Sequence, residues 1–220
     1  MRKANYDKYP STKFKGFLVR GWDEARCVIT ERCSDIVAVD LYTGTFEEAI
    51  LSELSACFDK VIDTRSLMKG EEELRAMTQP FMTDDVLFGY MTNLRILDFF
   101  DMEKLEDARM EVASSGVRTM VFGTGAALVV PEGASIIYAD MARWEIQQRF
   151  RRHLVKALGI DNHDDPVSIQ YKRGLFIDWR LLDMYKDKLM AKVDFWLDTN
   201  AADDPKMIDR ATFFEGMDRT

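Results

Sequence analysis

Short runs of apolar residues recur along the chain, separated by longer segments that mix apolar and polar positions. The runs cover residues 35–40, 60–63, 118–123, 135–140 and 193–198. Such runs are typical of strands that are buried on both faces of a parallel sheet. The pattern predicts an α/β fold: a three-layer, open, mostly parallel sheet of about five strands.

Helical periodicity fills the segments between these strands. Apolar residues three or four positions apart place one buried face on residues 45–58, 102–113 and 175–190. Because strands then alternate with helices along the chain, we expect consecutive strands to be joined by βαβ connections.

The two ends of the chain depart from this alternation. Residues 16–22 and 25–30 are rich in β-forming residues on either side of Asp23 and Glu24, which predicts a β-hairpin. Residues 199–205 have the composition of a linker. The predicted organisation is an N-terminal extension with the hairpin over 1–34, an α/β domain over 35–200 and a C-terminal linker or tail over 201–220.

Composition limits the classes of partner. The 220 residues carry 38 acidic and 30 basic side chains, a net charge of −8. Nucleic-acid binding depends on basic residues that neutralise phosphates, so we expect no nucleic-acid partner. No apolar run reaches the roughly 18–20 residues of a membrane helix, and the polar start lacks a signal-peptide core. We therefore expect a cytoplasmic protein without a membrane partner.

Potential metal ligands are scarce. The cysteines Cys27, Cys33 and Cys57 and the histidines His153 and His163 do not have the spacing of a zinc site. Buried thiols and surface imidazoles are the favoured interpretation. We expect no metal site made from this chain alone and find no sign of a cofactor.

The loop after the first predicted parallel strand, residues 41–45, has the position of a P-loop. A P-loop needs Gly-Lys-Ser/Thr, because its backbone N–H groups and lysine hold the phosphates and its hydroxyl holds Mg²⁺. The chain contains no Gly-Lys dipeptide, and acids follow Thr45. Thr45 and Glu48 have the spacing of a capping box, which favours a structural role over an ATP site.

Carboxylates stand where open α/β sheets bind ligands, beyond the carboxyl ends of the strands. Asp40, Asp63 and Asp140 each end a predicted strand. A carboxylate in such a place can hold Mg²⁺ or act as a base, and N-capping of the following helix explains each one at least as well. These three residues are weak candidates for catalysis.

A basic helix is the main candidate for a phosphate site. Arg143, Arg149 and Arg152 share one side of this helix, and guanidinium groups bind phosphate through two hydrogen bonds. The alternative is salt bridging with Glu145 and with the acids of residues 161–165. The residues support both interpretations about equally.

A glycine turn follows the third predicted strand, in Gly123-Thr-Gly-Ala-Ala127. Glycines there permit a positive φ or a close approach of the backbone to a ligand. Gly123 and Gly125 therefore join the candidate phosphate site. No helix clearly starts after them, so tight packing of the turn is favoured over phosphate binding.

The layout from Asp35 to Asp198 resembles the uridine-kinase-like branch of the P-loop kinases. The matching parts are a strand and loop at 35–45, a Val-Phe-Gly strand at 120–123, a strand at 136–140 and a lid-like Arg149-Phe-Arg-Arg152. The resemblance implies a P-loop kinase-like fold. Because the Walker lysine and hydroxyl are missing, it carries over the fold and the arginine site rather than kinase activity.

A second resemblance covers nearly the whole chain and is to the N-terminal region of bacterial class I mannose-6-phosphate isomerase-like proteins. The matching segments are 5–12, 79–85, 123–128, 138–147, 171–174 and 198–200. In that family this region precedes a cupin domain, which carries the metal and the aldose–ketose isomerisation. The resemblance implies a cupin isomerase domain as partner, with zinc in that domain, because two scattered histidines cannot supply the metal site.

Three functions follow as hypotheses. The first is a catalytically degenerate, kinase-like accessory domain of mannose-6-phosphate isomerase that binds a sugar phosphate or a nucleotide. The second is an active nucleoside or sugar kinase with an atypical phosphate loop. The third is a structural module that docks on a cupin isomerase domain.

Overall fold

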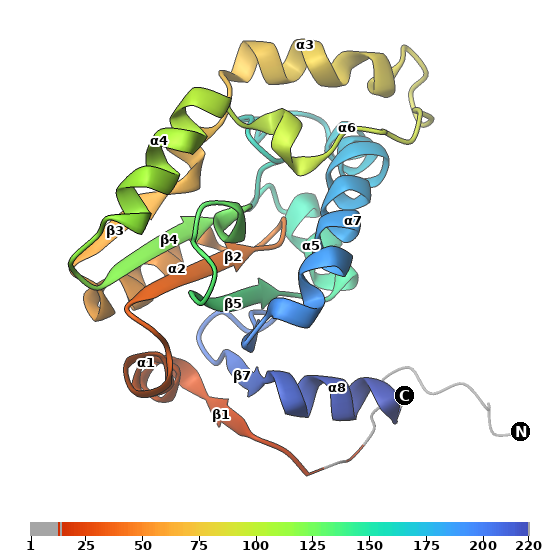
Figure 1. The fold of residues 1–220 in the computed structure, drawn as a ribbon. Helices are drawn as coiled ribbons and strands as arrows, with labels where there is room; N and C mark the ends of the chain where they lie inside the picture. Colours follow the sequence, from red (N-terminus) through yellow and green to blue (C-terminus); the bar gives the residue numbers. More distant parts are fainter. Residues whose placement is uncertain (1–12, 14, 220) are drawn as a thin grey trace, which may run out of the picture.

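The structure is a computed structural model that describes residue 13 and residues 15–219, and these form one sheet with helices on both faces (Figure 1). The strands are β1 (Leu18–Arg20), β2 (Ile36–Leu41), β3 (Lys60–Asp63), β4 (Thr119–Gly123), β5 (Ser135–Asp140), β6 (Phe195–Asp198) and β7 (Lys206–Asp209). The helices are α1 (Gly21–Arg32), α2 (Glu47–Leu54), α3 (Glu71–Met82), α4 (Met102–Ala113), α5 (Arg143–Arg151), α6 (Val167–Arg173), α7 (Trp179–Leu189) and α8 (Arg210–Asp218). Short 3₁₀ turns, η3 (Ile96–Phe99) and η4 (Ala126–Leu128) among them, join these elements, and a π-helical segment, Gly174–Asp178, links α6 to α7.

The sheet confirms the predicted α/β class with mostly parallel strands. Within the described residues its order is β1-β7-β6-β5-β2-β4-β3. All five predicted strands are present as β2 to β6, and they pair in parallel. The sheet has seven strands rather than about five because β7 pairs antiparallel with β6 and β1 pairs antiparallel with β7.

The predicted N-terminal hairpin is wrong. Only Leu18–Arg20 is a strand, and residues 25–30 lie in α1. Ala25, Val28 and Ile29 are the buried residues of this helix, and their spacing of three and four gives it one apolar face against the sheet. Burial of that face overrides the β propensity of the segment. The segment 5–12, which carried part of the resemblance, lies outside the described residues.

The C-terminal segment is part of the sheet rather than a linker-like tail. Strand β7 and helix α8 both lie after residue 200. The ring of Phe213 on α8 stacks on the ring of Trp196 on β6, with the ring centroids 4.0 Å apart. Strands from both predicted end segments therefore extend the sheet of the predicted 35–200 domain.

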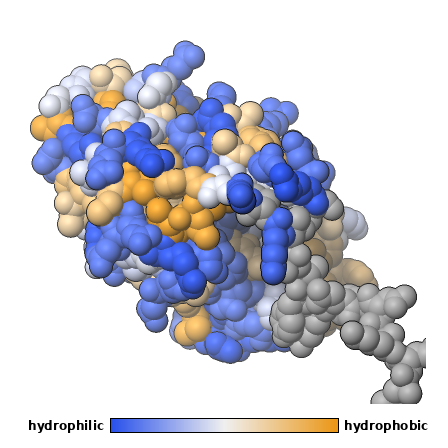
Figure 2. Space-filling view, turned by 90° about the horizontal axis from the view of Figure 1, so that it is seen from below, coloured by the Kyte–Doolittle hydropathy of each residue, from blue (hydrophilic) through white to orange (hydrophobic). Residues whose placement is uncertain are grey.

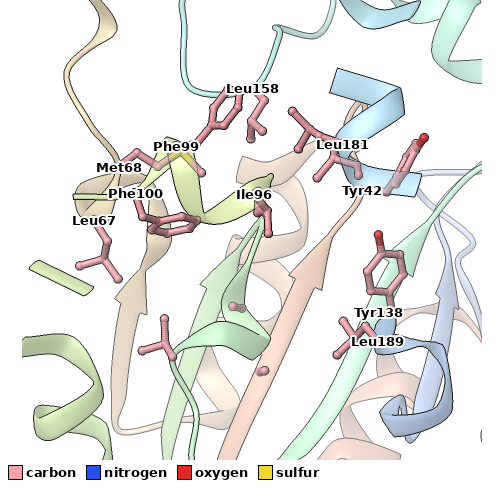
Figure 3. Packing of buried hydrophobic residues seen from close by; sticks show 14 of the residues in the cluster. Tyr42, Leu67, Met68, Ile96, Phe99, Phe100, Tyr138, Leu158, Leu181 and Leu189 are labelled. Atoms are coloured by element: carbon pink, nitrogen blue, oxygen red, sulfur yellow. The ribbon is translucent and has the colours of Figure 1, made fainter. Parts of the chain in front are cut away.

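Two buried clusters cover the two faces of the sheet and make three layers. On β2, Val37 and Val39 pack in the cluster that contains residues of α1 and α2. Ala38 between them belongs to the larger cluster, with residues of α4 and α7. Figure 3 shows part of this larger cluster, with Tyr138 on β5 and Leu189 on α7 close together.

Strand β2 lies at the centre of the sheet between β4 and β5. From β2 the chain crosses to β3 and β4 on one side, and from β5 it continues to β6 on the other side. Neighbouring strands whose connections leave in opposite directions form a topological switch point, and ligands bind beyond the carboxyl ends of such strands. The ends of β2, β4 and β5, which carry several of the candidate site residues, lie at or next to this switch point.

None of the described helices is long and apolar enough to cross a membrane. The face in Figure 2 is mostly hydrophilic, with one group of hydrophobic residues near its middle.

The end of β4 yields a first prediction. Gly123 has φ +120°, and a Cβ at this residue would lie 2.1 Å from the hydroxyl oxygen of Thr64. Gly123→Ala should therefore lower the free energy of unfolding by about 1–3 kcal/mol, measured by urea denaturation. The matched control is Gly116→Ala, where the added Cβ meets no atom within 4 Å. Equal stability of the two variants would contradict this account.

Candidate functional site

The three candidate aspartates lie along the carboxyl edge of the parallel sheet. Asp40 is the penultimate residue of β2, Asp63 ends β3 and Asp140 ends β5. Because these strands are parallel, their carboxyl ends point to the same edge. The side chains differ in their contacts, and the contacts decide which of them is available for a ligand.

Asp40 is fully buried and is bonded within the protein. One carboxylate oxygen accepts the Gly125 N–H at 3.0 Å, and the other accepts the Ala127 N–H at 2.9 Å and the Tyr185 hydroxyl at 2.5 Å. Burial raises the pKa of Asp40 to about 6, while the Tyr185 hydroxyl and the backbone donors oppose that rise. The group is therefore mostly ionised at neutral pH, and no lysine or arginine in the described part of the chain forms an ion pair with it.

The glycine turn binds an anion, and that anion is the protein's own carboxylate. Gly123 and Gly125 have φ +120° and +82°, and this conformation directs the N–H groups of Gly125 and Ala127 to Asp40. Successive N–H groups in such a turn form an anion-binding concavity. The Gly125 N–H is already used, so a phosphate would have to displace the Asp40 carboxylate.

Arg149 is buried beneath the turn that joins β2 to α2. It is 1% exposed. Its guanidinium donates to the carbonyl of Gly44 at 2.8 Å and to the carbonyl of Thr199 at 2.8 Å, and it lies 3.8 Å from the ring centroid of Phe46. Its Nε atom is 3.3 Å from Glu145, which is the predicted salt-bridging alternative. A phosphate cannot reach this guanidinium from solvent.

The turn between β2 and α2 therefore has the opposite polarity to a phosphate loop. A carbonyl group of the turn points to a buried cation, whereas a phosphate loop points N–H groups at an anion. The predicted capping box is wrong, because the Thr45 hydroxyl donates to the Tyr42 carbonyl and Glu48 pairs with Arg65. Helix α2 instead begins at Glu47 after Phe46, which makes no side-chain cap.

Arg143 belongs to a polar cluster at the end of β2. Its Nη2 atom donates to the Tyr42 hydroxyl at 3.0 Å and to Asp183 at 2.9 Å. Its guanidinium carbon lies 4.3 Å from the ring centroid of Trp179. Burial and the Asp183 carboxylate raise the pKa of Tyr42, so its hydroxyl stays protonated. Arg143 is partly exposed, in contrast to the buried Arg149.

The other predicted residues have structural partners or face solvent. Asp63 caps the following 3₁₀ turn by accepting the Arg65 N–H and also pairs with the Arg65 side chain, which confirms the capping interpretation. Asp140 pairs with Lys186 at 3.1 Å. Arg152 is exposed and makes no ion pair among the described residues, so it does not join Arg149 in one site.

Three of the partners come from α7, and sequence reasoning missed them as site residues. Tyr185 reaches Asp40, Asp183 reaches Tyr42 and Arg143, and Lys186 reaches Asp140. Tyr185 lies within the range 175–190, for which the periodicity predicts only an apolar helix face. Tyr185 and Asp40 are 145 positions apart in the sequence, so no local sequence pattern indicates their contact. Figure 3 shows the Tyr42 and Tyr138 rings near α7.

No group of three histidine, cysteine, aspartate or glutamate side chains in residues 13 and 15–219 could hold a metal ion. The two histidines lie close together, with ring centroids 6.1 Å apart, and His153 contacts the carbonyl of His163 through Nδ1.

A family described as a domain of unknown function, DUF8485, matches residues 21–220. The chain belongs to this family. The match begins at α1 and takes in β2 to β7, so it includes Asp40, the glycine turn and the whole of α7. A search of curated proteins finds no match. The DUF8485 assignment therefore adds no activity to what the site itself shows.

The raised pKa of Asp40 predicts a pH-dependent stability. The folded pKa of about 6 lies above the unfolded value of 3.8, so the native state binds more protons between these pH values. The free energy of unfolding should fall as pH rises through this window, by up to about 3 kcal/mol at 1.36 kcal/mol per pKa unit. Asp40→Asn removes this dependence. Urea denaturation of both proteins at several pH values measures it, and a constant difference between them would contradict the burial effect.

The buried position of Arg149 predicts a structural role. Arg149→Met leaves the carbonyl groups of Gly44 and Thr199 without their donor, which should cost about 2–4 kcal/mol of unfolding free energy. Arg152→Met removes the same charge from an exposed position and should change stability by less than about 0.5 kcal/mol. Urea denaturation compares the two. A loss below about 1 kcal/mol in the first variant would contradict a structural role.

Proposed function

We propose that the chain is a kinase-like domain that has lost phosphoryl transfer and serves as an accessory domain of a sugar-phosphate isomerase. The loss of phosphoryl transfer rests on one observation, the contact between the β2–α2 turn and Arg149. The Gly44 carbonyl accepts a hydrogen bond from a buried guanidinium at the place where a kinase would hold phosphates with N–H groups.

The layout of the sheet supports the kinase-like part of the proposal. A central first parallel strand, a glycine-bearing strand beside it and a strand followed by an arginine-rich helix are the parts on which the resemblance rests. These parts are β2, β4, β5 and α5. The position of β2 beside β5 at a switch point supports a ligand-binding ancestry of this edge.

The charged residues at the edge are arranged unfavourably for phosphoryl transfer, which supports the proposal that this activity is lost. Glu47 and Glu48 occupy the first turn of α2, where a triphosphate would be repelled, and both pair with Arg65. Asp40 is bonded to the glycine turn and to Tyr185, so it is not free to hold Mg²⁺ or to accept a proton from a substrate. An active kinase with an atypical loop is the weaker hypothesis for these reasons.

A group of exposed apolar residues favours the accessory role. Five side chains between residues 86 and 91 are each at least 57% exposed: Val86, Leu87, Phe88, Tyr90 and Met91. The turn that presents them is held by Asp85, which accepts the Leu87 and Phe88 N–H groups, and by the buried Lys172. Contiguous apolar surface on an ordered turn is typical of a protein interface. The cupin isomerase domain is the partner that the sequence resemblance implies.

The ligand and the metal follow from the same resemblance. A sugar phosphate is the small molecule of the proposed isomerase system, and Arg143 is the partly exposed arginine available to bind it. Zinc would be held by the cupin domain and not by these residues. The proposed place of action is the cytoplasm.

The proposal predicts that the chain does not transfer phosphate from Mg·ATP. Incubation with Mg·ATP and a panel of sugar and nucleoside acceptors should release ADP no faster than a reaction without protein, measured by a coupled ADP assay. Turnover that is reproducible and is lost in Asp40→Ala would overturn the proposal, because it would make Asp40 a catalytic residue. As a positive control, an active sugar kinase is assayed in parallel to show that ADP is detected.

A further inference from the structure

A large cleft runs along α7, on the sheet face that carries α4 and the larger core cluster. Helix α7 forms one wall, residues 91–97 form the other, and the segment 127–136 between β4 and β5 forms the floor. Its volume is about 1370 Å³. Pockets for drug-sized ligands have volumes of about 300–1,000 Å³, so the cleft has room for an organic molecule of nucleotide size. None of the predicted site residues lines it.

The face of α7 that lines the cleft is apolar in its middle and basic at its ends. Leu181 and Met184 line the cleft between Arg180 and Lys188, and Leu189 follows Lys188. Eight residues of helix separate the two cations, which corresponds to about 12 Å at 1.5 Å per residue. This helix face therefore combines an apolar surface with two positive charges.

The other walls add cations for which the described residues show no ion pair. Arg95 and Lys192 line the cleft, are exposed and make no ion pair among the described residues, and the same holds for Arg180 and Lys188. Arg210 is paired with Asp194 at 2.8 Å.

Five of the seven charged residues that line the cleft are basic, in a chain with 38 acidic and 30 basic residues. Like charges gathered around a cleft with low-dielectric walls raise the local concentration of the opposite ion. The cleft is therefore a positive site on an acidic protein.

We propose that this cleft binds an organic phosphate that carries an aromatic or otherwise apolar group. The apolar group lies on Leu181 and Met184, and the phosphate pairs with Arg180 or Lys188 at an end of the stripe. Guanidinium and ammonium groups both bind phosphate through charge-assisted hydrogen bonds. The ligand has two parts because the walls have two kinds of surface. The cations match a phosphate, and the apolar stripe matches an apolar group.

The Tyr185 side chain links the cleft to the sheet edge. It lines the cleft, and its hydroxyl donates to Asp40, which in turn accepts the N–H groups of the glycine turn. A ligand in the cleft thus contacts the helix that closes the carboxyl edge. The proposal does not depend on the loss of phosphoryl transfer, because the cleft lies apart from the β2–α2 turn.

Isothermal titration calorimetry with 1-naphthyl phosphate tests the proposal on the full chain. We expect saturable 1:1 binding, and at least tenfold weaker binding of inorganic phosphate and of 1-naphthol, which are the two halves of the probe. At least one of Arg180→Glu and Lys188→Glu should weaken binding of 1-naphthyl phosphate at least tenfold, because the single phosphate pairs with one of the two cations; unchanged binding in both variants would overturn the proposal. Higher salt should weaken it as well, because the charges are exposed.

The control variant is Lys104→Glu, which makes the same change of charge on the exposed face of α4, outside the cleft. It should bind 1-naphthyl phosphate as the wild type does, and all three variants should keep the melting temperature of the wild type within about 4 °C. Absence of binding to the wild type would overturn the proposal. Equal weakening by Lys104→Glu would also overturn it, because the attraction would then come from net charge and not from the cleft.

Discussion

Buried charges must be hydrogen-bonded or paired, and this constraint organises the carboxyl edge of the sheet. Asp40 meets it through two N–H groups of the glycine turn and the Tyr185 hydroxyl. Arg149 meets it through carbonyl groups of the β2–α2 turn and of the residues after β6. Each charge therefore ties together segments that are far apart in the sequence. Arg143, Asp183 and Tyr42 add further polar links between α5, α7 and the turn after β2.

The same contacts give the edge its chemical character. A sheet edge at a switch point is a common ligand site because backbone N–H groups, helix N-termini and polar side chains converge there. In this protein an internal carboxylate occupies the N–H groups of the glycine turn, and an internal guanidinium occupies the turn where phosphates would lie. The backbone polar groups of these two turns are thus hydrogen-bonded to the protein's own side chains. Arg143, Asp183 and the Tyr42 hydroxyl form the partly exposed remainder of the edge.

Helix α7 has different roles on its two sides. One side supplies Asp183 and Lys186 to the polar edge, and the other presents Arg180, Met184 and Lys188 to the cleft. Tyr185 lies at the boundary between them. A single helix therefore closes the carboxyl edge of the sheet and forms one wall of the cleft. Events in the cleft and at the edge have a direct physical connection through this side chain.

The sequence by itself determined the five parallel strands, the positions of the candidate aspartates and the absence of a phosphate loop. These features depend on local patterns: continuous apolar runs, strand ends and a missing Gly-Lys dipeptide. N-capping is an open alternative for all three aspartates, and it holds for Asp63, whose contact spans two residues. The strand prediction for residues 25–30 rests on their β-forming composition, whereas Ala25, Val28 and Ile29 form the buried face of a helix.

Only the tertiary structure decided which charged residues are available for a ligand. Arg149 and Arg152 are equivalent in sequence pattern, yet the first is 1% exposed and the second faces solvent. The partners of Asp40 lie 85, 87 and 145 positions away, and those of Arg149 include a residue 105 positions away. Periodicity and motif spacing report contacts within a few turns of helix or across one strand end. Contacts at such separations are set by how the sheet orders its strands and by where α7 packs.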